Sequence, residues 1–244
     1  GGISVIGRSG QNFYNDGATT CINLSSGDKF TLDGQRLVLT GGTYGADQAV
    51  YHTEEDIFSS VQSLGTLGSG PEKFIVRTKT GIENQYGYTS DGKQQIPGYS
   101  EVVNWYITQT SDLYGNLISY AYLKDNNQVY PSEISYGPNK ITFTYSTRTD
   151  VTTSYLKGQK IQQTLLLDRI TVAYNNNNLR TYELKYNLTT DNYNSYSVLN
   201  EVIEYGTGSG RLNSTVFSYQ TPANVSITQS NHYTNYDKIS FPSL

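Results

Sequence analysis

The sequence has very few of the residues on which common catalytic centres depend. Its 244 residues include one cysteine, two histidines, one tryptophan and no methionine. A single cysteine cannot form an internal disulfide, so Cys21 leaves the redox compartment undetermined, and we expect it to be a small packed residue. Only His52 and His232 could serve as the base of a Ser-His-Asp centre, and neither lies near a Gly-x-Ser-x-Gly nucleophile turn.

Patterns that would mark a metal or phosphate site are missing as well. Two histidines and one cysteine do not make a zinc site at any recognised spacing. The glycine-rich stretches 65–71 and 206–211 lack the Gly-Lys pair of a phosphate-binding loop, and we interpret both as flexible connections. The acidic run Glu54, Glu55 and Asp56 could converge on one Ca²⁺ only in a loop, because neighbouring residues of a strand point to opposite faces, and we favour a solvated face. We therefore expect no catalytic residue, no metal and no cofactor.

The chain also lacks long runs of one character. No apolar stretch approaches the roughly 20 residues needed to cross a bilayer, and no signal-peptide pattern is visible. The net charge of −4, the pI near 5.2 and the lack of a basic run argue against nucleic acid as a partner. Because the chain begins on Gly1-Gly2 and stops on the apolar phrase ISFPSL, we interpret it as a piece of a longer protein.

Tyrosine, glycine and strand-like alternation are abundant. Tyr and Gly each number 23, and tyrosine favours strands because its ring packs while its hydroxyl reaches water. The segment 105–145 contains four alternating runs separated by the turn phrases SDLYGN, KDNNQ and GPN. In the last run one set of alternate residues is apolar (Ile141, Phe143, Tyr145) and the other is polar (Lys140, Thr142, Thr144). This period of two predicts a meander of four antiparallel strands with one buried face.

Similar alternation continues on both sides of the meander. Further strands are expected over 29–32, 36–40, 73–78, 164–174, 179–186, 198–205 and 215–219. Residues 51–63 suit a short helix or a strand, and we favour the strand, while the four asparagines at 175–178 predict an exposed hairpin tip. The predicted fold class is all-β: antiparallel meandering hairpins that form curved sheets, sandwich-like or shell-like, with little helix. We expect a Gly/Ser/Thr-rich β region over 1–70, an antiparallel sheet over 71–230 and a lead-in to further sequence over 231–244.

Nine residues stand out because they set the shape of the chain rather than its chemistry. They are Asp33, Gly34, Gln35, Arg36, Asp112, Gly115, Asn116, Arg148 and Asp150. The phrases that contain Asp33-Gly34 and Asp112 to Asn116 suit tight hairpins, since Asp and Asn bond their own backbone and Gly accepts a positive φ. Arg36 is placed to brace its turn through a bidentate bond to a carboxylate. Arg148 and Asp150 lie two residues apart, so they share one face of a strand or bracket a bend.

Phrases spread over nearly the whole chain resemble one known family. They are, in order, GISVIGRSG at 2–10, KFTLDGQRLVL at 29–39, YHTEEDIF at 51–58, GPEKFIVRTKTG at 70–81 and DLYGNLISYAY at 112–122. The second and the last are specific. Together they are similar to the N-terminal region of the Salmonella virulence plasmid B protein, which also opens the B component of bacterial insecticidal toxin complexes, proteins with YD (RHS-type) repeats.

The resemblance implies a larger assembly around this chain. A propeller and then YD repeats are expected to follow, with NYDKISFPSL at 235–244 as the lead-in. In such complexes the sheets of the B component help to build a hollow shell around a toxic C-terminal segment, while the propeller docks onto the pore-forming component. The implied partners are the rest of the same chain and other toxin-complex components, and the implied location is secreted or cell surface. Some relatives carry a separate ADP-ribosyltransferase, whose Ser-Thr-Ser and Glu-x-Glu signatures are missing here.

Three classes of function follow from these observations. We favour a non-catalytic structural and assembly module that contributes to a β shell. A surface-exposed adhesin or glycan-binding module would use exposed aromatic rings as stacking platforms, and Trp105 beside Tyr106 is the best candidate patch. A hydrolase with an unrecognised site is the third class, and a cleft with convergent carboxylates would be its mark.

Overall fold

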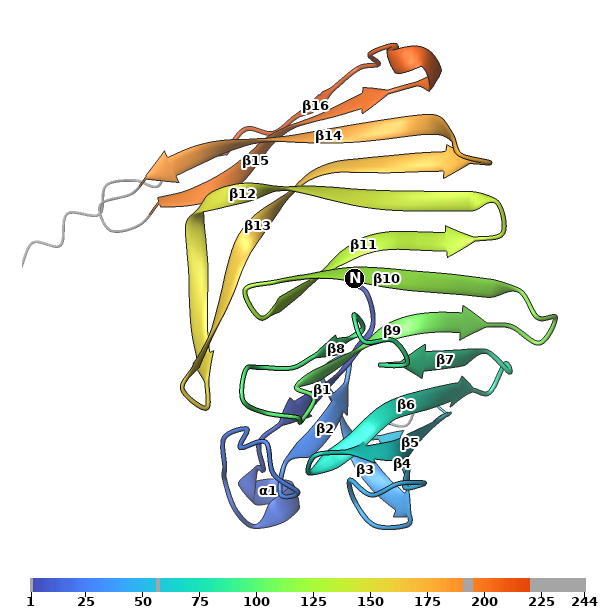
Figure 1. The fold of residues 1–244 in the computed structure, drawn as a ribbon, viewed down its shortest axis with the longest axis vertical. Helices are drawn as coiled ribbons and strands as arrows, with labels where there is room; N and C mark the ends of the chain where they lie inside the picture. Colours follow the sequence, from blue (N-terminus) through green and yellow to red (C-terminus); the bar gives the residue numbers. More distant parts are fainter. Residues whose placement is uncertain (1, 56–57, 191–194, 220–244) are drawn as a thin grey trace, which may run out of the picture.

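The computed structural model describes residues 2–55, 58–190 and 195–219. Within these ranges the chain forms one antiparallel sheet of 16 strands, together with a four-residue helix α1 (Phe13–Asp16) and a 3-10 turn η1 (Thr207–Ser209). The predicted all-β class with little helix is confirmed (Figure 1). No helix of the described residues is long and apolar enough to cross a membrane.

Eight strands close into a ring, which we call the barrel. They are β1 (Val5–Ser9), β2 (Lys29–Leu32), β3 (Gln35–Gly41), β4 (Val50–Thr53), β5 (Ser59–Leu67), β6 (Gly70–Thr78), β7 (Glu83–Tyr86) and β9 (Asn104–Ser111). The ring closes because β9 pairs with β7 along one part of its length and with β1 along another, where Ile6 faces Trp105. A short β8 (Lys93–Gln94) pairs with β9 beside the ring.

The chain then leaves the barrel as an open sheet. Its strands are β10 (Leu117–Asp125), β11 (Gln128–Tyr136), β12 (Asn139–Leu156), β13 (Gln159–Tyr174), β14 (Asn177–Thr190), β15 (Ser195–Tyr205) and β16 (Thr215–Val216). Each strand pairs with its neighbour in sequence, so β9 to β12 form the predicted four-strand meander. Figure 1 shows these strands stacked above the barrel, ending at β16.

The deepest core lies inside the barrel. Alternate strand residues point inward there, and the largest fully buried side chains include Trp105, Tyr51, Tyr86, Phe30 and Phe74. The rings of Phe30, Phe74 and Trp105 pack edge to face, with centroids 5.0 to 5.5 Å apart. Edge-to-face packing adds to the stabilisation that these rings gain from burial, so they form the centre of the barrel core.

The β12–β13 hairpin is far longer than its neighbours and bends out of the sheet. β11 pairs with β12 only over Asn139–Thr142, and β14 pairs with β13 only over Arg169–Tyr174. Beyond these residues the two strands continue as a ribbon whose pairing is interrupted between Thr147 and Thr152. In Figure 1 the far half of this ribbon turns down at the left and runs beside the barrel. We call residues 152–163 the arm.

The structure corrects some of the sequence-based expectations and agrees with others. Cys21 is exposed rather than packed. Residues 65–71 are not a flexible connection but the tip of the β5–β6 hairpin, so the expected division at residue 70 falls inside a paired unit. Residues 51–63 are strand at both ends, as favoured, in β4 and β5. The expected lead-in over 231–244 lies outside the described residues.

Candidate functional site

The nine shape-determining residues lie at three separate places: the β2–β3 turn, the β9–β10 turn and the bend of β12. At the first place Asp33 and Gly34 both have positive φ (51° and 87°), as the Asp-Gly hairpin signal predicts. The Asp33 carboxylate accepts bonds from Val5 N (2.8 Å) and from the Ser4 hydroxyl (2.7 Å). The turn therefore also fixes the start of β1, the strand on which ring closure depends.

Arg36 does bind a carboxylate, but the partner comes from α1. Its Nη2 donates to Asp16 Oδ1 at 2.6 Å, and Lys29 Nζ lies 3.6 Å from the same oxygen. Although its partial burial opposes ionisation, the bond from Asn12 N and the neighbouring Arg36 and Lys29 lower the pKa of Asp16. The bond ties the helical loop to the barrel wall. The buried Oε1 of Gln35 has no hydrogen-bond partner within the described part of the chain.

At the β9–β10 turn the three predicted residues act as one unit. Asp112 Oδ1 accepts bonds from Tyr114 N (2.8 Å) and Asn116 N (2.9 Å), and Oδ2 accepts one from Asn116 Nδ2 (2.7 Å). The bonds from Asn116 are the main cause of the lowered pKa of Asp112. Gly115 has φ +82°, as its turn position requires. The turn is rigid and presents Leu113 and Tyr114 to solvent, with Tyr114 91% exposed.

Arg148 and Asp150 sit at the bend of β12. Arg148 Nε and Nη2 donate to the two carboxylate oxygens of Asp150, at 3.0 and 2.7 Å. The same carboxylate accepts bonds from the backbone N (2.6 Å) and the hydroxyl (2.7 Å) of Ser197 in β15. Bonding by Arg148, followed by that of Ser197, holds the pKa of Asp150 far below its usual range. The two residues lie in the unpaired stretch of β12 and are joined there by an ion pair.

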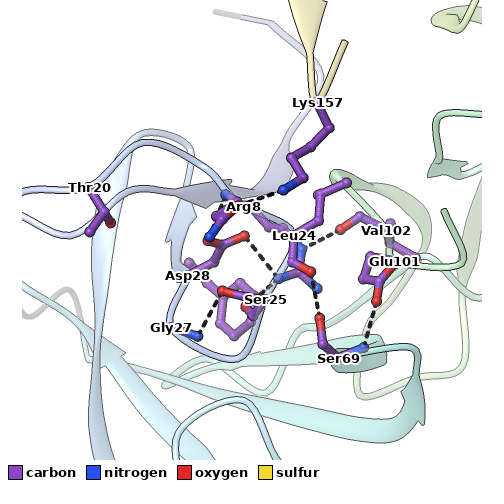
Figure 2. A network of polar contacts seen from close by, with 12 residues as sticks. Arg8, Thr20, Leu24, Ser25, Gly27, Asp28, Ser69, Glu101, Val102 and Lys157 are labelled. Atoms are coloured by element: carbon purple, nitrogen blue, oxygen red, sulfur yellow. Dashed lines mark hydrogen bonds and ion pairs between the residues drawn. The ribbon is translucent and has the colours of Figure 1, made fainter. Parts of the chain in front are cut away.

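The sequence analysis missed a buried polar cluster around Arg8, which Figure 2 shows. The Arg8 side chain is fully buried, its Nε donates to Val102 O (2.7 Å) and its Nη1 lies 3.2 Å from Asp28 Oδ2. Burial is the main cause of its lowered pKa, and the charge of Asp28 opposes that shift. Nη1 also donates to Ser25 O (3.2 Å). Arg8 thus joins β1, the loop before β2 and the segment before β9.

The Arg8 cluster is closely packed, so we expect it to tolerate little change. The guanidinium lies over the rings of Phe30 and Trp105, 5.6 and 5.7 Å from their centroids. A Cβ at Gly70 would come within 2.5 Å of Arg8 Nη2, so this position on β6 requires glycine. The sequence signal was a lone arginine in the strand phrase VIGRS, where an apolar or small residue is expected.

Of the residues considered for catalysis, the structure describes His52, Glu54 and Glu55. His52 Nδ1 lies 2.6 Å from the carbonyl oxygen of its neighbour Thr53, and Glu54 and Glu55 are exposed. Asp56 and His232 lie outside the described residues. Among the residues that the structure describes, no three His, Cys, Asp or Glu side chains gather where they could hold a metal ion.

The proposed aromatic platform needs correction. Trp105 is 0% exposed, packs in the barrel core and donates its Nε1–H to Glu72 O (3.0 Å). Tyr106 is half-buried against Tyr122, with ring centroids 5.2 Å apart. Alternating neighbours of a strand point to opposite sides, so this pair does not form one exposed stacking surface.

One extended apolar surface does exist, on one face of the open sheet. Cross-strand partners share a face, and the register aligns Ile134 with Ile141 and Val172, and Phe143 with Ile170 and Tyr182. We call this surface the apolar face. Its members are Ile118, Tyr120, Ile134, Tyr136, Ile141, Phe143, Ile170, Val172, Tyr174, Tyr182, Leu184 and Val202.

The two faces of the open sheet differ in chemistry. The members of the apolar face are half-buried or exposed, with Tyr136 at 45% and Tyr174 at 46%. The opposite face carries the ion pairs Lys140–Glu133 (3.0 Å) and Arg169–Glu183 (3.2 Å). The apolar face carries one ion pair as well, Arg180–Glu204 (3.0 Å), beside Val172 and Tyr182. Most of its other side chains are apolar, which is typical of a sheet whose apolar side meets another layer.

Comparison with solved structures identifies the fold. The chain superposes on the crystal structure of TcdB2-TccC3 (TM-score 0.71, 14% identity, 90% of this chain and 14% of that chain). It also matches the Photorhabdus luminescens Tc holotoxin pore structure (TM-score 0.68, 14% identity, 89% of this chain and 14% of that chain). A third match is the N-terminal domain of the effector SpvB from Salmonella typhimurium strain LT2 (TM-score 0.62, 15% identity, 89% of this chain and 87% of that chain).

These likenesses agree with the sequence resemblance. No protein-family model and no curated protein sequence matches the chain. The chain spans 14% of the length of the toxin-complex chains and 87% of the SpvB domain. At these identities the comparison establishes a common fold, and the proteins that share it are those suggested by the phrases around LDGQRL and DLYGNLISYAY.

Proposed function

We propose that this chain is a non-catalytic structural and assembly module of a secreted toxin-complex or YD-repeat protein. In this role it forms part of a β shell that encloses or presents a toxic C-terminal segment. The observation that carries the proposal is the apolar face, which continues the wall of a self-contained barrel into an open sheet.

The physical reason is the cost of leaving such a face in water. Exposed apolar patches larger than a few hundred Å² mark sites of interaction, because burial gains roughly 25 cal/mol per Å². Tyrosine suits a surface of this kind, since its ring buries well and its hydroxyl tolerates water. Partners of this chain are then the rest of its own protein and other components of the complex.

The comparisons support the same role. The matched chains are components of toxin complexes and the N-terminal domain of an effector protein. The glycan-binding alternative has lost its best candidate, because Trp105 is buried in the barrel. For the hydrolase alternative, Glu54 and Glu55 line one open pocket together with Asn12, Gln35 and Arg36, and no histidine is among the described residues that line it.

The proposal is tested in the full-length protein with neighbouring residues on opposite faces. Ile170→Asp places a charge on the apolar face, and Thr171→Asp places the same charge on the polar face of the same strand. We expect the first variant to lose complex formation and toxin delivery, and the second to keep both. Each variant is first checked for cooperative unfolding. Equal assembly by both folded variants would contradict the proposal.

A second arm of the test addresses catalysis. The combined variant His52→Ala, Glu54→Gln and Glu55→Gln is expected to leave the activity of the full-length protein largely intact. Loss of activity with folding and assembly preserved would assign a catalytic role to this region instead.

A further inference from the structure

We propose that the arm, residues 152–163, is a brace that holds the barrel and the open sheet at one fixed angle. Its base is locked by Arg148, Asp150 and Ser197, and its tip is docked on the barrel. The inference goes beyond the proposed function and does not depend on it, because it rests on contacts within this chain alone.

The bend at the base of the arm is an unusually large bulge. Thr147 pairs with Leu165 and Thr152 with Gln163, so residues 148–151 of β12 stand opposite Thr164 alone. Extra residues in one strand bend the ribbon and increase its twist. The strand ladder does not set the direction of a bend whose residues are unpaired, so side-chain interactions must set it.

The Asp150 carboxylate supplies that fixation. Its side chain is 4% exposed, and it accepts two bonds from Arg148 within the bulge and two from Ser197 in β15. Bidentate arginine–carboxylate pairs have a fixed geometry and are among the stronger polar interactions. Because Ser197 belongs to the open sheet, these four bonds set the angle at which the arm leaves it.

The middle of the arm rests on the β10–β11 turn. Gln162 N donates to Asn126 O (3.0 Å), and Asn127 Nδ2 donates to Lys160 O (2.7 Å). The carbonyl oxygen of Asn127 in turn accepts a bond from Nε2 of Gln94 (2.7 Å), a residue of β8 that is 4% exposed. The turn therefore lies between the arm and the strands of the barrel, bonded to both.

The tip of the arm reaches the barrel itself. Leu156 and Ile161 pack on a separate buried cluster formed by Leu24, Ile96 and Val103. Lys157 Nζ donates to Asn23 Oδ1 (2.8 Å). Figure 2 shows Lys157 extending toward the residues around Arg8. Asn23 N donates to Asp28 Oδ1 (2.9 Å). The tip is thereby connected to the buried Arg8 cluster of the barrel.

A second attachment matters because the first one is short. β10 pairs with β9 only over Leu117–Ser119, and all later strands of the open sheet follow from β10. Tyr122 of the same strand adds bonds to Asp91 and Ile107, so these attachments all belong to one edge of the open sheet. A sheet held along one edge can twist about it, since strand pairs tolerate a wide range of twist. The arm extends from β12 and β13, two strands further into the open sheet, and two separate attachments define one angle.

The proposal is tested by measuring the distance between the two parts in solution. Spin labels are placed at Ser60→Cys in the barrel and Asn187→Cys in the open sheet, both exposed, in a Cys21→Ser background. Double electron–electron resonance is expected to give one narrow distance for the parent protein. When Thr152–Gln163 is replaced with Asn-Gly, we expect the narrow distance to become a broad distance distribution.

Point variants separate bracing from folding. Asp150→Ala at the base and Ile161→Asp at the tip should each broaden the distance distribution while strand content by circular dichroism stays unchanged. Tyr155→Ser is the matched control, because this side chain lies at the tip but is 70% exposed, and it should leave the distance narrow. A disulfide between Asn23→Cys and Lys157→Cys should restore the narrow distance to the Asp150→Ala protein.

Two results would overturn the proposal. The first is a narrow, unchanged distance in the protein whose arm has been replaced. If the protein with the replaced arm does not fold, the two point variants decide instead. A narrow distance distribution in both folded variants, Asp150→Ala and Ile161→Asp, would then overturn the proposal.

Discussion

The barrel and the open sheet are built from the same alternating strands, yet they bury their side chains to very different degrees. In the barrel, Trp105, Phe74 and Leu37 are 0% exposed, because the ring surrounds them on all sides. In the open sheet the equivalent alternation produces the apolar face, where Tyr136 and Tyr174 remain about half exposed (45% and 46%). Closing a sheet supplies a core from its own residues, whereas an open sheet needs a second layer to do so.

The polar interactions differ in the same way. The Arg8–Asp28 pair of the barrel has side chains 0% and 2% exposed, while Arg169 in the pair with Glu183 is 46% exposed. Asp150 is the exception in the open sheet, with a side chain 4% exposed. Exposed pairs occur in the barrel too, such as Arg77–Glu83, but the fully buried pair is found there, so we expect the barrel to be the more stable part of the chain.

The largest expected effect comes from removing matched aromatic side chains in the two parts. Trp105→Ala leaves a cavity in a closed core and should cost about 3–5 kcal/mol of unfolding free energy. Phe143→Ala on the apolar face removes a half-buried ring and should cost about 1 kcal/mol, roughly half of what full burial is worth. Urea unfolding of both variants measures the difference. Equal costs would show that the open sheet has a core of its own.

Ion pairs give the next test of the comparison. Arg8→Ala leaves the Asp28 carboxylate buried without its partner and should cost about 3–5 kcal/mol. Arg169→Ala breaks a pair that solvent screens, so the expected cost is about 0–1 kcal/mol. Both costs are measured from urea unfolding midpoints. Arg8→Lys is the control, because it keeps the positive charge but not the planar set of guanidinium donors.

A smaller and pH-dependent effect is expected at Asp150. Its pKa is lower in the folded chain than the value of about 3.9 for an unfolded aspartate. Its bonds therefore contribute stability that is complete above about pH 5 and is lost as the pH falls below about 4. Asp150→Asn should cost about 2 kcal/mol near neutral pH.

The gap between the Asp150→Asn variant and the parent should shrink steadily as the pH is lowered toward 2. Other carboxylates titrate in both proteins, so the difference in unfolding free energy between the two isolates Asp150. A gap that stays constant between pH 7 and pH 2 would mean that this carboxylate is not held ionised by Arg148 and Ser197.

Two turn residues give the last comparison, and the smallest expected effect is at the second of them. Gly115→Val forces a branched side chain into positive φ, which should cost about 1–3 kcal/mol through strain. Asn176→Gly changes a residue that already has φ +62° at an exposed tip, so it should alter stability by less than about 0.5 kcal/mol. Denaturant midpoints of the two variants would contradict the turn assignments if their order were reversed.

Local sequence was enough to predict most strands and turns. The alternation of Ile141, Phe143 and Tyr145 determines which face is apolar, and Asp33-Gly34 determines a hairpin, because both signals act between near neighbours. The tip predicted from four asparagines is a tighter turn, since Asn177 and Asn178 already pair with Tyr174 and Ala173.

Features that depend on distant residues could not be predicted in this way. Ring closure joins β1 to β9, about a hundred residues later, and no local pattern encodes that register. Burial of Arg8 depends on Val102 and Asp28, which only the closed ring brings together. For the same reason the short motif around Trp105 favoured a surface platform, although closure places the indole at the centre of the barrel.

Hydrogen–deuterium exchange of the chain alone tests most directly whether the barrel is self-sufficient and the open sheet is not. We predict that amides of β5 and β6 exchange only through global unfolding, whereas those of β14 and β15 exchange much faster through local opening. Adding the partner layer in the full-length protein should slow exchange in β14 and β15 and leave β5 and β6 unchanged. Equal protection of the two parts in the isolated chain would contradict the account.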